Sequence, residues 1–270
     1  MDQRTHTGWL EPLTALAREA GLETLKYFHP SGVPVDHKAD GSPVTEADRA
    51  AEAVIEAGLA RLAPHIPMVG EEANSAGRIP DIRGGPFWLV DPLDGTKDFV
   101  RGVGEYTVNI ALIEGGVPTL GVIYAPVDDI AYRGLVGGVA SKITPDRAVQ
   151  PISVRSIPTA GLTIVTSRSH RDPTAFNKRL NGVTVSETRP VGSSLKLCLL
   201  AEGAADLYPR HGPTMEWDIA AGHAIVVAAG GHLTQLDGEP FTYGKPGFEN
   251  PNFVAWGAGS HPPGFYADPK

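Results

Sequence analysis

Two carboxylates stand three residues apart in the segment Asp91-Pro-Leu-Asp94-Gly, directly after the apolar run at residues 87–90. Pro92 fixes its own φ and has no amide hydrogen, so we expect the buried strand to end at Asp91 and Gly95 to permit a tight bend. Neighbouring carboxylates repel each other unless a cation lies between them, and oxygen ligands suit Mg²⁺. The segment therefore predicts either a metal site or a turn in which both Asp side chains accept backbone amides.

Acidic residues elsewhere in the first half allow the same two interpretations. Thr45 and Asp48 have the form of a capping box before a helical pattern, and a structural role would be sufficient for Asp48. Glu71 and Glu72 follow a short predicted strand at residues 66–69, and at least one of them must face away from any apolar layer. A catalytic role and an exposed loop are both open for this pair.

Two predicted helix starts supply candidates in the second half. Asp218 lies at the start of a strongly apolar helix expected over residues 216–229, and its type suits an N-cap. Ser193 and Ser194 precede another helix and are equally good caps. A Gly-Ser-Ser loop at a helix start, followed by Lys196, is also a favourable place for an anion. Capping and anion binding both remain open on these residues alone.

Hydrophobic periodicity predicts the elements that position these residues. Helical spacing predicts amphipathic helices over residues 8–28 and from residue 46 to just before Pro64. Two β-branched runs joined by Glu114-Gly-Gly predict a hairpin over residues 107–124. Further strands are expected at residues 130–132, 162–166, 183–185 and 205–208.

These elements indicate a layered α/β fold with two lobes. The first lobe, residues 1–150, combines helices with an antiparallel sheet and would hold the metal site. The second lobe, residues 151–270, alternates strands and helices and would supply phosphate-binding residues. Residues 137–156 are punctuated by Gly and Pro, so we expect this segment to join the lobes.

Composition limits the class of protein. The 270 residues are 41% hydrophobic and 20% charged, which is typical of a globular protein with a large core. The single cysteine, Cys198, excludes an intramolecular disulfide, and its apolar flanks indicate a buried thiol. No signal peptide or transmembrane run is found, so we expect a cytoplasmic location. A net charge of −8 argues against a nucleic acid polymer as partner, but not against a small phosphorylated ligand.

Three separated motifs resemble those of one enzyme family. Gly70-Glu-Glu, Asp91-Pro-Leu-Asp94-Gly-Thr and Trp217-Asp-Ile-Ala-Ala-Gly are similar, in order and spacing, to the signatures of the lithium-sensitive, magnesium-dependent phosphatases of the inositol monophosphatase superfamily. Within that superfamily, the blocks at residues 94–99, 104–113, 121–126 and 192–196 resemble the CysQ-type 3′(2′),5′-bisphosphate nucleotidases. The resemblance implies the inositol monophosphatase and fructose-1,6-bisphosphatase-like αβαβα sandwich.

The same resemblance implies a metal-dependent hydrolysis. Thr96 and Glu71 would position the attacking water, and Asp48 would bond to Thr96 and help to remove the proton. The amides of Gly95 and Thr96 would receive the phosphate. The residues that would hold two or three Mg²⁺ ions are Glu71, Asp91, Asp94, Asp218 and, through its carbonyl, Leu93.

The implied substrate is adenosine 3′,5′-bisphosphate, cleaved to AMP and phosphate, with its sulfated relative as a second candidate. A bisphosphate needs a second anion site, to which Arg210 and His170 could belong. The alternative to this role is a structural ion pair for Arg210 and an ordinary surface or core histidine for His170. Besides Gly95 and Thr96, the implied substrate-binding residues are His170, Ser193, Lys196, Arg210 and Asp218.

Two departures from the nucleotidase pattern bear on substrate preference and not on hydrolysis. Asp98 stands where that branch usually has Glu, and Gly70 where it often has Ser. An inositol monophosphatase or broad sugar-phosphate phosphatase is therefore the alternative, and a non-catalytic metal- or nucleotide-binding protein is a further one. The protein would act as a monomer or homodimer.

Overall fold

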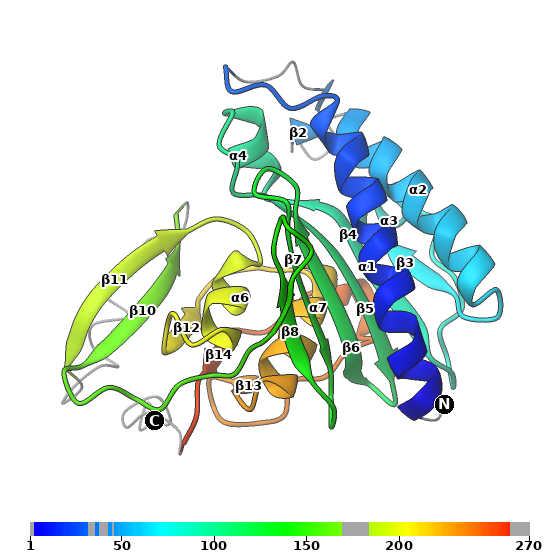
Figure 1. Ribbon diagram of the computed structural model, residues 1–270. Helices are drawn as coiled ribbons and strands as arrows, with labels where there is room; N and C mark the ends of the chain where they lie inside the picture. Colours follow the sequence, from blue (N-terminus) through cyan, green and yellow to red (C-terminus); the bar gives the residue numbers. More distant parts are fainter. Residues whose placement is uncertain (1–2, 32–35, 38–42, 45, 169–183, 260–270) are drawn as a thin grey trace.

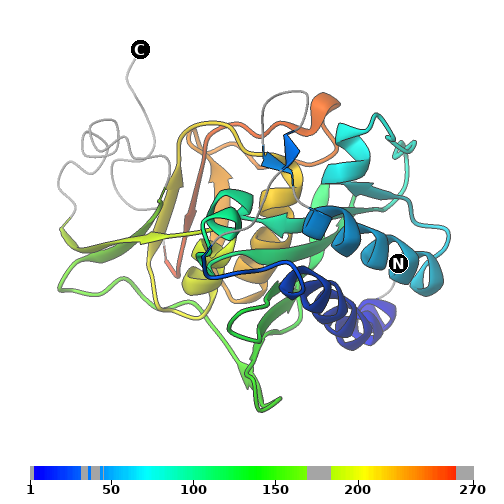
Figure 2. The same ribbon diagram turned by 90° about the horizontal axis from the view of Figure 1, so that it is seen from above.

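The structure is a computed structural model that describes residues 3–31, 36–37, 43–44, 46–168 and 184–259. This part of the chain forms four layers in which helices alternate with sheets (Figures 1 and 2). Helices α1 (Gln3–Leu25) and α2 (Glu46–Leu62) cover one face of a seven-stranded sheet, and α7 (Glu216–Ala228) covers the other. Beyond α7 lie α6 (Leu195–Ala201) and a five-stranded sheet. The expected layered α/β architecture is confirmed.

The seven-stranded sheet has the order β3-β4-β5-β6-β7-β8-β9. Strands β3 and β4 are parallel, and every other pair is antiparallel. The expected hairpin is β5 and β6. The strands are β3 Met68–Gly70, β4 Phe87–Asp94, β5 Thr107–Glu114, β6 Val117–Ala125, β7 Ile130–Leu135, β8 Ala140–Ile143 and β9 Val149–Pro151.

The five-stranded sheet has the order β11-β10-β12-β14-β13, with β10 parallel to both of its neighbours. Its strands are β10 Leu162–Ser167, β11 Val185–Val191, β12 Leu207–Arg210, β13 His232–Gln235 and β14 Phe253–Trp256. The remaining elements are short: β1 Asp36–His37, β2 Pro43–Val44, α3 Glu71–Ser75, α4 Thr96–Val100 and the 3₁₀ turn η1 Pro246–Phe248.

The segment at residues 137–156 differs from the expectation, because most of it extends the first sheet as β8 and β9. Gly137, Gly138 and Pro145 lie in hairpin turns and not in a linker; the turn between β8 and β9, for example, is closed by the Arg147 amide donating to the Thr144 carbonyl at 2.8 Å. The change from one sheet to the other falls between Pro151 and Leu162.

Helix α7 lies in a furrow of the seven-stranded sheet. Gly121 on β6 and Gly134 on β7 are paired across the two strands. A Cβ on Gly121 would overlap the carbonyl oxygen of Ala221, and one on Gly134 would lie 2.7 Å from the Cα of Ile225. At these two positions the helix backbone therefore approaches the sheet directly, while side chains of both elements pack around them. In the described residues no helix has the length and apolar composition needed to cross a membrane.

Candidate active site

A cavity of about 280 Å³ lies where the two halves of the chain meet. Its wall includes residues from α3, α4, α6 and α7, together with the ends of β4, β10 and β12. The carboxylates on this wall are Glu71, Asp94, Asp98 and Asp218. The cations on it are Lys97, Arg168, Lys196 and Arg210.

Most of the residues predicted for the site come together here. Gly95, Thr96 and Ser193 line the cavity with the charged residues above, while Asp48 and Asp91 are buried at 2% and 1% exposure. Leu93 is also buried, directly before Asp94. His170 lies outside the described residues.

Strand β4 does not end at Asp91, contrary to the expectation. Asp91 pairs with Asn109 and Asp94 with Thr107, so the ladder continues across an irregularity that takes up Pro92 and Leu93. The Leu93 amide donates to Asp91 Oδ1 at 3.0 Å. The bulge leaves Asp91 below the surface and brings Asp94 to the cavity wall.

Glu71 is the first residue of α3 and not part of a loop. A carboxylate from α2 holds the start of this short helix: Glu52 accepts the amides of Glu72 and Ala73, at 2.8 and 2.7 Å. Glu52 is 3% exposed, and burial raises its pKa even though the two amides favour the charged form. Sequence analysis missed Glu52, although it lies one turn after Asp48 on the buried face of α2.

The carboxylates of the site repel one another. Burial raises the pKa of Asp91 well above its usual value, and the charges of Glu71, Asp94, Asp218 and Asp48 raise it further. The pKa of Asp218 is raised well above its usual value by burial and then by Asp94 and Glu71. The pKa of Asp94 is also raised by burial, against the opposing effect of Lys196. A bound divalent cation would remove this repulsion.

The donor set fits a hard cation in its chemistry, because it consists of carboxylate and carbonyl oxygens. Its geometry is not that of a ready-made ligand shell: within the described ranges, no three His, Cys, Asp or Glu side chains are gathered closely enough to hold a metal ion. Asp91 and Asp218 each accept a hydrogen bond from a backbone amide, and these bonds help to keep their carboxylates apart. The carboxylates would have to converge when a cation binds.

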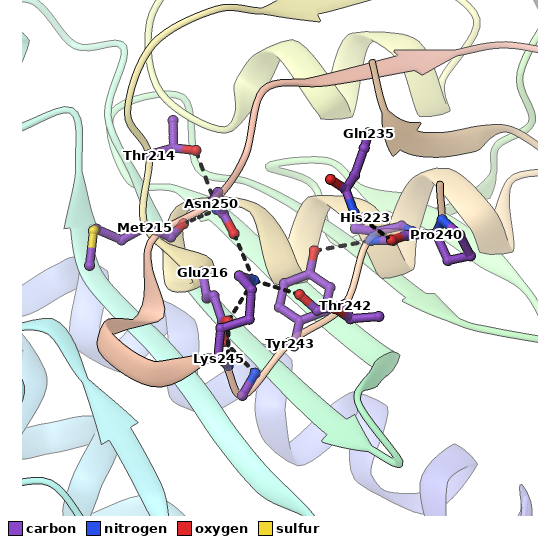
Figure 3. Close-up of polar contacts among 11 residues, drawn as sticks. Thr214, Met215, Glu216, His223, Gln235, Pro240, Thr242, Tyr243, Lys245 and Asn250 are labelled. Atoms are coloured by element: carbon purple, nitrogen blue, oxygen red, sulfur yellow. Dashed lines mark hydrogen bonds and ion pairs between the residues drawn. The ribbon is translucent and has the colours of Figure 1, made fainter. Parts of the chain in front are cut away.

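Asp218 is the third residue of α7, and the N-cap is Met215. The carboxylate of Asp218 reaches back and accepts the Met215 amide at 2.9 Å, which satisfies a backbone donor at the helix start. Asn250 also holds this residue, because its Nδ2 donates to the Met215 carbonyl at 2.6 Å (Figure 3). The structure places Met215 at the N-cap, while Asp218 caps the helix start from the third helical position.

An ion pair with a fully buried carboxylate also anchors the start of α7. Glu216 is 0% exposed and accepts the amides of Gly244 and Lys245 at 2.7 and 2.9 Å (Figure 3). The Lys245 ammonium lies 2.6 Å from Glu216 Oε1. The segment at residues 244–250 thus fixes the helix start that presents Asp218.

Gly95 is the N-cap of α4 and has a left-handed conformation, with φ of 100°, as expected for a tight bend. The Thr96 hydroxyl donates to the Leu93 carbonyl at 3.2 Å. This bond joins the expected water-positioning residue to an expected metal ligand. The bond expected between Asp48 and Thr96 stays a prediction.

Ser193 and Lys196 form a further part of the cavity wall. Ser193 has a φ of 47°, which is unusual for a residue other than Gly. The Lys196 ammonium donates to the carbonyls of Val191, at 3.2 Å, and of Ser193, and it lies 5.3 Å from the centre of the Tyr208 ring. Burial lowers the pKa of Lys196 to about 8. This lysine both lines the cavity and holds the loop that precedes α6.

Arg210 lies at the end of β12 and is 8% exposed. Its Nη2 donates to the Pro213 carbonyl at 3.0 Å. Its Nε is buried and has no hydrogen-bond partner within the described part of the chain. The guanidinium therefore keeps donor capacity for a ligand. Arg168, which sequence analysis did not select, lines the same cavity, and its position directly after β10 was the available signal.

Comparison with known proteins places this geometry in context. The sequence profile of the Inositol monophosphatase family matches residues 7–261. The 3′(2′),5′-bisphosphate nucleotidase CysQ of Escherichia coli O157:H7 is 43% identical over 254 residues, which are 90% of this chain and 98% of that protein. The crystal structure of CysQ from Bacteroides thetaiotaomicron superimposes with a TM-score of 0.78 at 35% identity, covering 93% of this chain and 97% of that one. An inositol monophosphatase from Anabaena has a TM-score of 0.73 at 28% identity, covering 93% and 90%.

Proposed function

Because the chain belongs to the inositol monophosphatase family, we propose that it is a magnesium-dependent phosphatase that removes the 3′-phosphate of adenosine 3′,5′-bisphosphate, giving AMP and phosphate. The observation that carries the proposal is a single cavity with a group of repelling carboxylates and four cations on its wall. With a metal bound, the carboxylates would hold the phosphate that is cleaved. The cations would bind a second phosphate. The names of the CysQ relatives support this substrate class.

We assign the metal ligands as a proposal. The ligands of two or three ions would be the side chains of Glu71, Asp91, Asp94 and Asp218 and the carbonyl of Leu93. Bound Mg²⁺ would supply Lewis-acid activation of the phosphate and of a water molecule. This assignment is supported by the burial of Asp91 and by its repulsion from the neighbouring carboxylates.

The side chains around the ligands would orient the reactants. Glu71 would accept a hydrogen bond from the attacking water, Thr96 would fix the water's direction, and Asp48 would take up its proton. The amides of Gly95 and Thr96 would donate to the phosphate oxygens. On the cationic side, Ser193, Lys196, Arg210 and His170, with Asp218 at the boundary, would bind the remainder of the nucleotide.

Other features of the protein follow as proposals. The sulfated relative of the bisphosphate is a second substrate candidate, because the cations would accept either group. The metal site would belong to a first lobe, residues 1–150, and the nucleotide site to a second, residues 151–270. A cytoplasmic location and a monomeric or homodimeric state complete the proposal.

An inositol monophosphatase activity is the second candidate. The Anabaena inositol monophosphatase has the same fold over nearly the whole chain, and Gly70 precedes the Glu pair as in inositol phosphatases. The two candidates share the metal chemistry and differ in whether a second phosphate is bound.

Phosphate release with Mg²⁺, from adenosine 3′,5′-bisphosphate and from inositol 1-phosphate at matched concentrations, distinguishes them. We expect kcat/KM to favour the nucleotide by about a hundredfold, which corresponds to about 2.7 kcal/mol of transition-state stabilisation. The reverse preference would favour the second candidate. Uptake of Mg²⁺ and nucleotide without phosphate release under any condition would indicate a binding protein.

A further inference from the structure

Arg168 is a cation on the cavity wall that is not among the residues assigned individually to substrate binding. It directly follows β10, and its side chain is 30% exposed. Its Nη2 donates to Glu105 Oε2 at 2.7 Å, and its Nη1 donates to Asp98 Oδ2 at 3.3 Å. Asp98 belongs to α4, and Glu105 lies between α4 and β5. One guanidinium therefore connects the five-stranded sheet to a segment of the other half of the chain.

Glu105 extends this connection to the loop that leads into α6. The same oxygen, Oε2, accepts the Gly192 amide at 2.7 Å. Gly192 is packed so closely that a Cβ would lie 2.6 Å from the Glu105 carbonyl oxygen and 2.8 Å from Asp98 Oδ2. Arg168, Asp98, Glu105 and Gly192 form one packed unit, which we call the Arg168 cluster.

The loop held by the Arg168 cluster carries residues assigned to the second phosphate. Ser193 follows Gly192 and has a positive φ, a conformation that persists in a residue with a Cβ only when its surroundings hold it. Lys196 bonds to the Ser193 carbonyl, so its position depends on the same loop. Gly95 lies next to Ser193: a Cβ on Gly95 would be 3.4 Å from that of Ser193. A shift of the loop would therefore change the cavity wall.

The charges of the cluster lead to the same conclusion. Asp98 and Glu105 are anionic, and Arg168 is the cation in the described residues that bridges them. Without it, both carboxylates would act on an approaching phosphate by repulsion. With it, one of the two negative charges is compensated, and the substrate meets a fixed loop. Because the cluster holds the loop with Ser193 and Lys196, it acts on the residues assigned to the part of the substrate that is not cleaved.

We propose that Arg168 is a positioning residue that sets the preference for substrates with a second phosphate. This inference rests on the proposed function, because it concerns the phosphate that is retained. Adenosine 3′,5′-bisphosphate and adenosine 3′-monophosphate differ only in that group, so they form a matched pair of substrates. Arg168 acts through Glu105 and the Gly192 loop, which fix where Ser193 and Lys196 lie.

Steady-state kinetics of Arg168→Ala with both nucleotides test the inference. We expect KM for the bisphosphate to rise about tenfold or more, with kcat changed less than about twofold. For the monophosphate, both constants should stay within about threefold of the wild type. Arg168→Lys should restore part of the preference, because lysine keeps the charge but cannot bridge two carboxylates with a planar fork.

Arg155→Ala is the matched control. Arg155 binds the buried carboxylate of Asp206 through two bonds of 2.8 Å, in the same half of the chain and away from the cavity wall. We expect this variant to lose thermal stability and to keep the wild-type ratio of kcat/KM for the two nucleotides. An Arg168→Ala ratio equal to that of the wild type, or a ratio shifted equally by Arg155→Ala, would overturn the inference.

The outcomes separate the inference from the proposed function. If the wild-type enzyme cleaves neither nucleotide, both the proposed function and the inference about Arg168 are wrong. A wild-type enzyme that prefers the bisphosphate, with the same preference in Arg168→Ala, removes only the role of Arg168. If Arg168→Ala does not fold, Arg168→Lys and Glu105→Gln carry the test: an unchanged substrate ratio in both contradicts the inference.

Discussion

Replacing Glu52 with Gln should disturb Glu71 without touching the cavity. Both carboxylate oxygens of Glu52 accept backbone amides at the start of α3, and the helix has only five residues. A helix this short has little stability of its own, so its position depends on these bonds. The side-chain oxygen of Gln can still accept one of the two amides. Its NH₂ group would face the other backbone N–H. One charge-assisted hydrogen bond is lost, and two donors then face each other.

The stability cost follows from this geometry. Losing a buried hydrogen bond to a charged group costs about 1.5–3 kcal/mol. For a chain of this size, each kcal/mol lowers Tm by about 2–4 °C, so we expect Tm to fall by roughly 3–12 °C. Because Glu71 is a proposed metal ligand and water-positioning residue, activity or Mg²⁺ affinity should fall about 10–100-fold, as is usual for groups that orient metal ligands.

Phosphate release as a function of Mg²⁺ concentration, together with thermal unfolding, measures both effects. The control is Glu46→Gln on the same helix, where an exposed carboxylate pairs with Arg49 at 2.9 Å. This change should leave activity intact and move Tm by no more than about 1–2 °C. If Glu52→Gln loses stability but keeps wild-type turnover and Mg²⁺ dependence, the argument that Glu52 positions Glu71 is wrong.

Two further substitutions test the site itself. Asp91→Asn should abolish phosphate release and the stabilisation by Mg²⁺. The Tm measured without Mg²⁺ should stay at or above the wild-type value, because one of several mutually repelling carboxylates becomes neutral while the bond from the Leu93 amide persists. Retained turnover would remove Asp91 from the metal site. Gly95→Ala should cost about 1–2 kcal/mol in chemical denaturation, because the residue has a positive φ. The added Cβ would press on the Glu105 carbonyl at 3.2 Å, so kcat should fall at least about tenfold; unchanged kcat would show that the Gly95 amide does not bind the phosphate.

Local patterns predicted the elements that are long and regular. The apolar run of α7 has helical length and ends at Gly230-Gly231, and the β5–β6 hairpin has two β-branched runs around Gly115-Gly116. Strands β8 and β9 escaped prediction because they are short and their turns contain Gly and Pro, which also mark linkers. Asp91 was placed at a strand end because a bulge around Pro92 cannot be distinguished from a stop in sequence alone.

The site was predictable where a residue's role depends on its neighbours in sequence. The carboxylates Asp91 and Asp94 and the Ser193 loop were found in this way, and the structure brings Asp94 and the loop to one cavity. Glu52 and Arg168 were missed because their partners are remote: Glu105 is 63 positions from Arg168, and Gly192 is 87 positions from Glu105. No local pattern encodes a contact of that kind.

The furrow beneath α7 has a consequence for mutations far from the cavity. At Gly121 and Gly134 the helix backbone lies directly against the sheet, so at these two points its distance from the sheet is set by backbone contacts. A single methyl group added at either glycine would push α7 away from the sheet, because the atoms that it meets belong to the helix backbone and a close-packed interior transmits the strain. Asp218 would travel with it and leave its place among the other carboxylates. A substitution in the middle of a strand would then abolish catalysis in a variant that still folds.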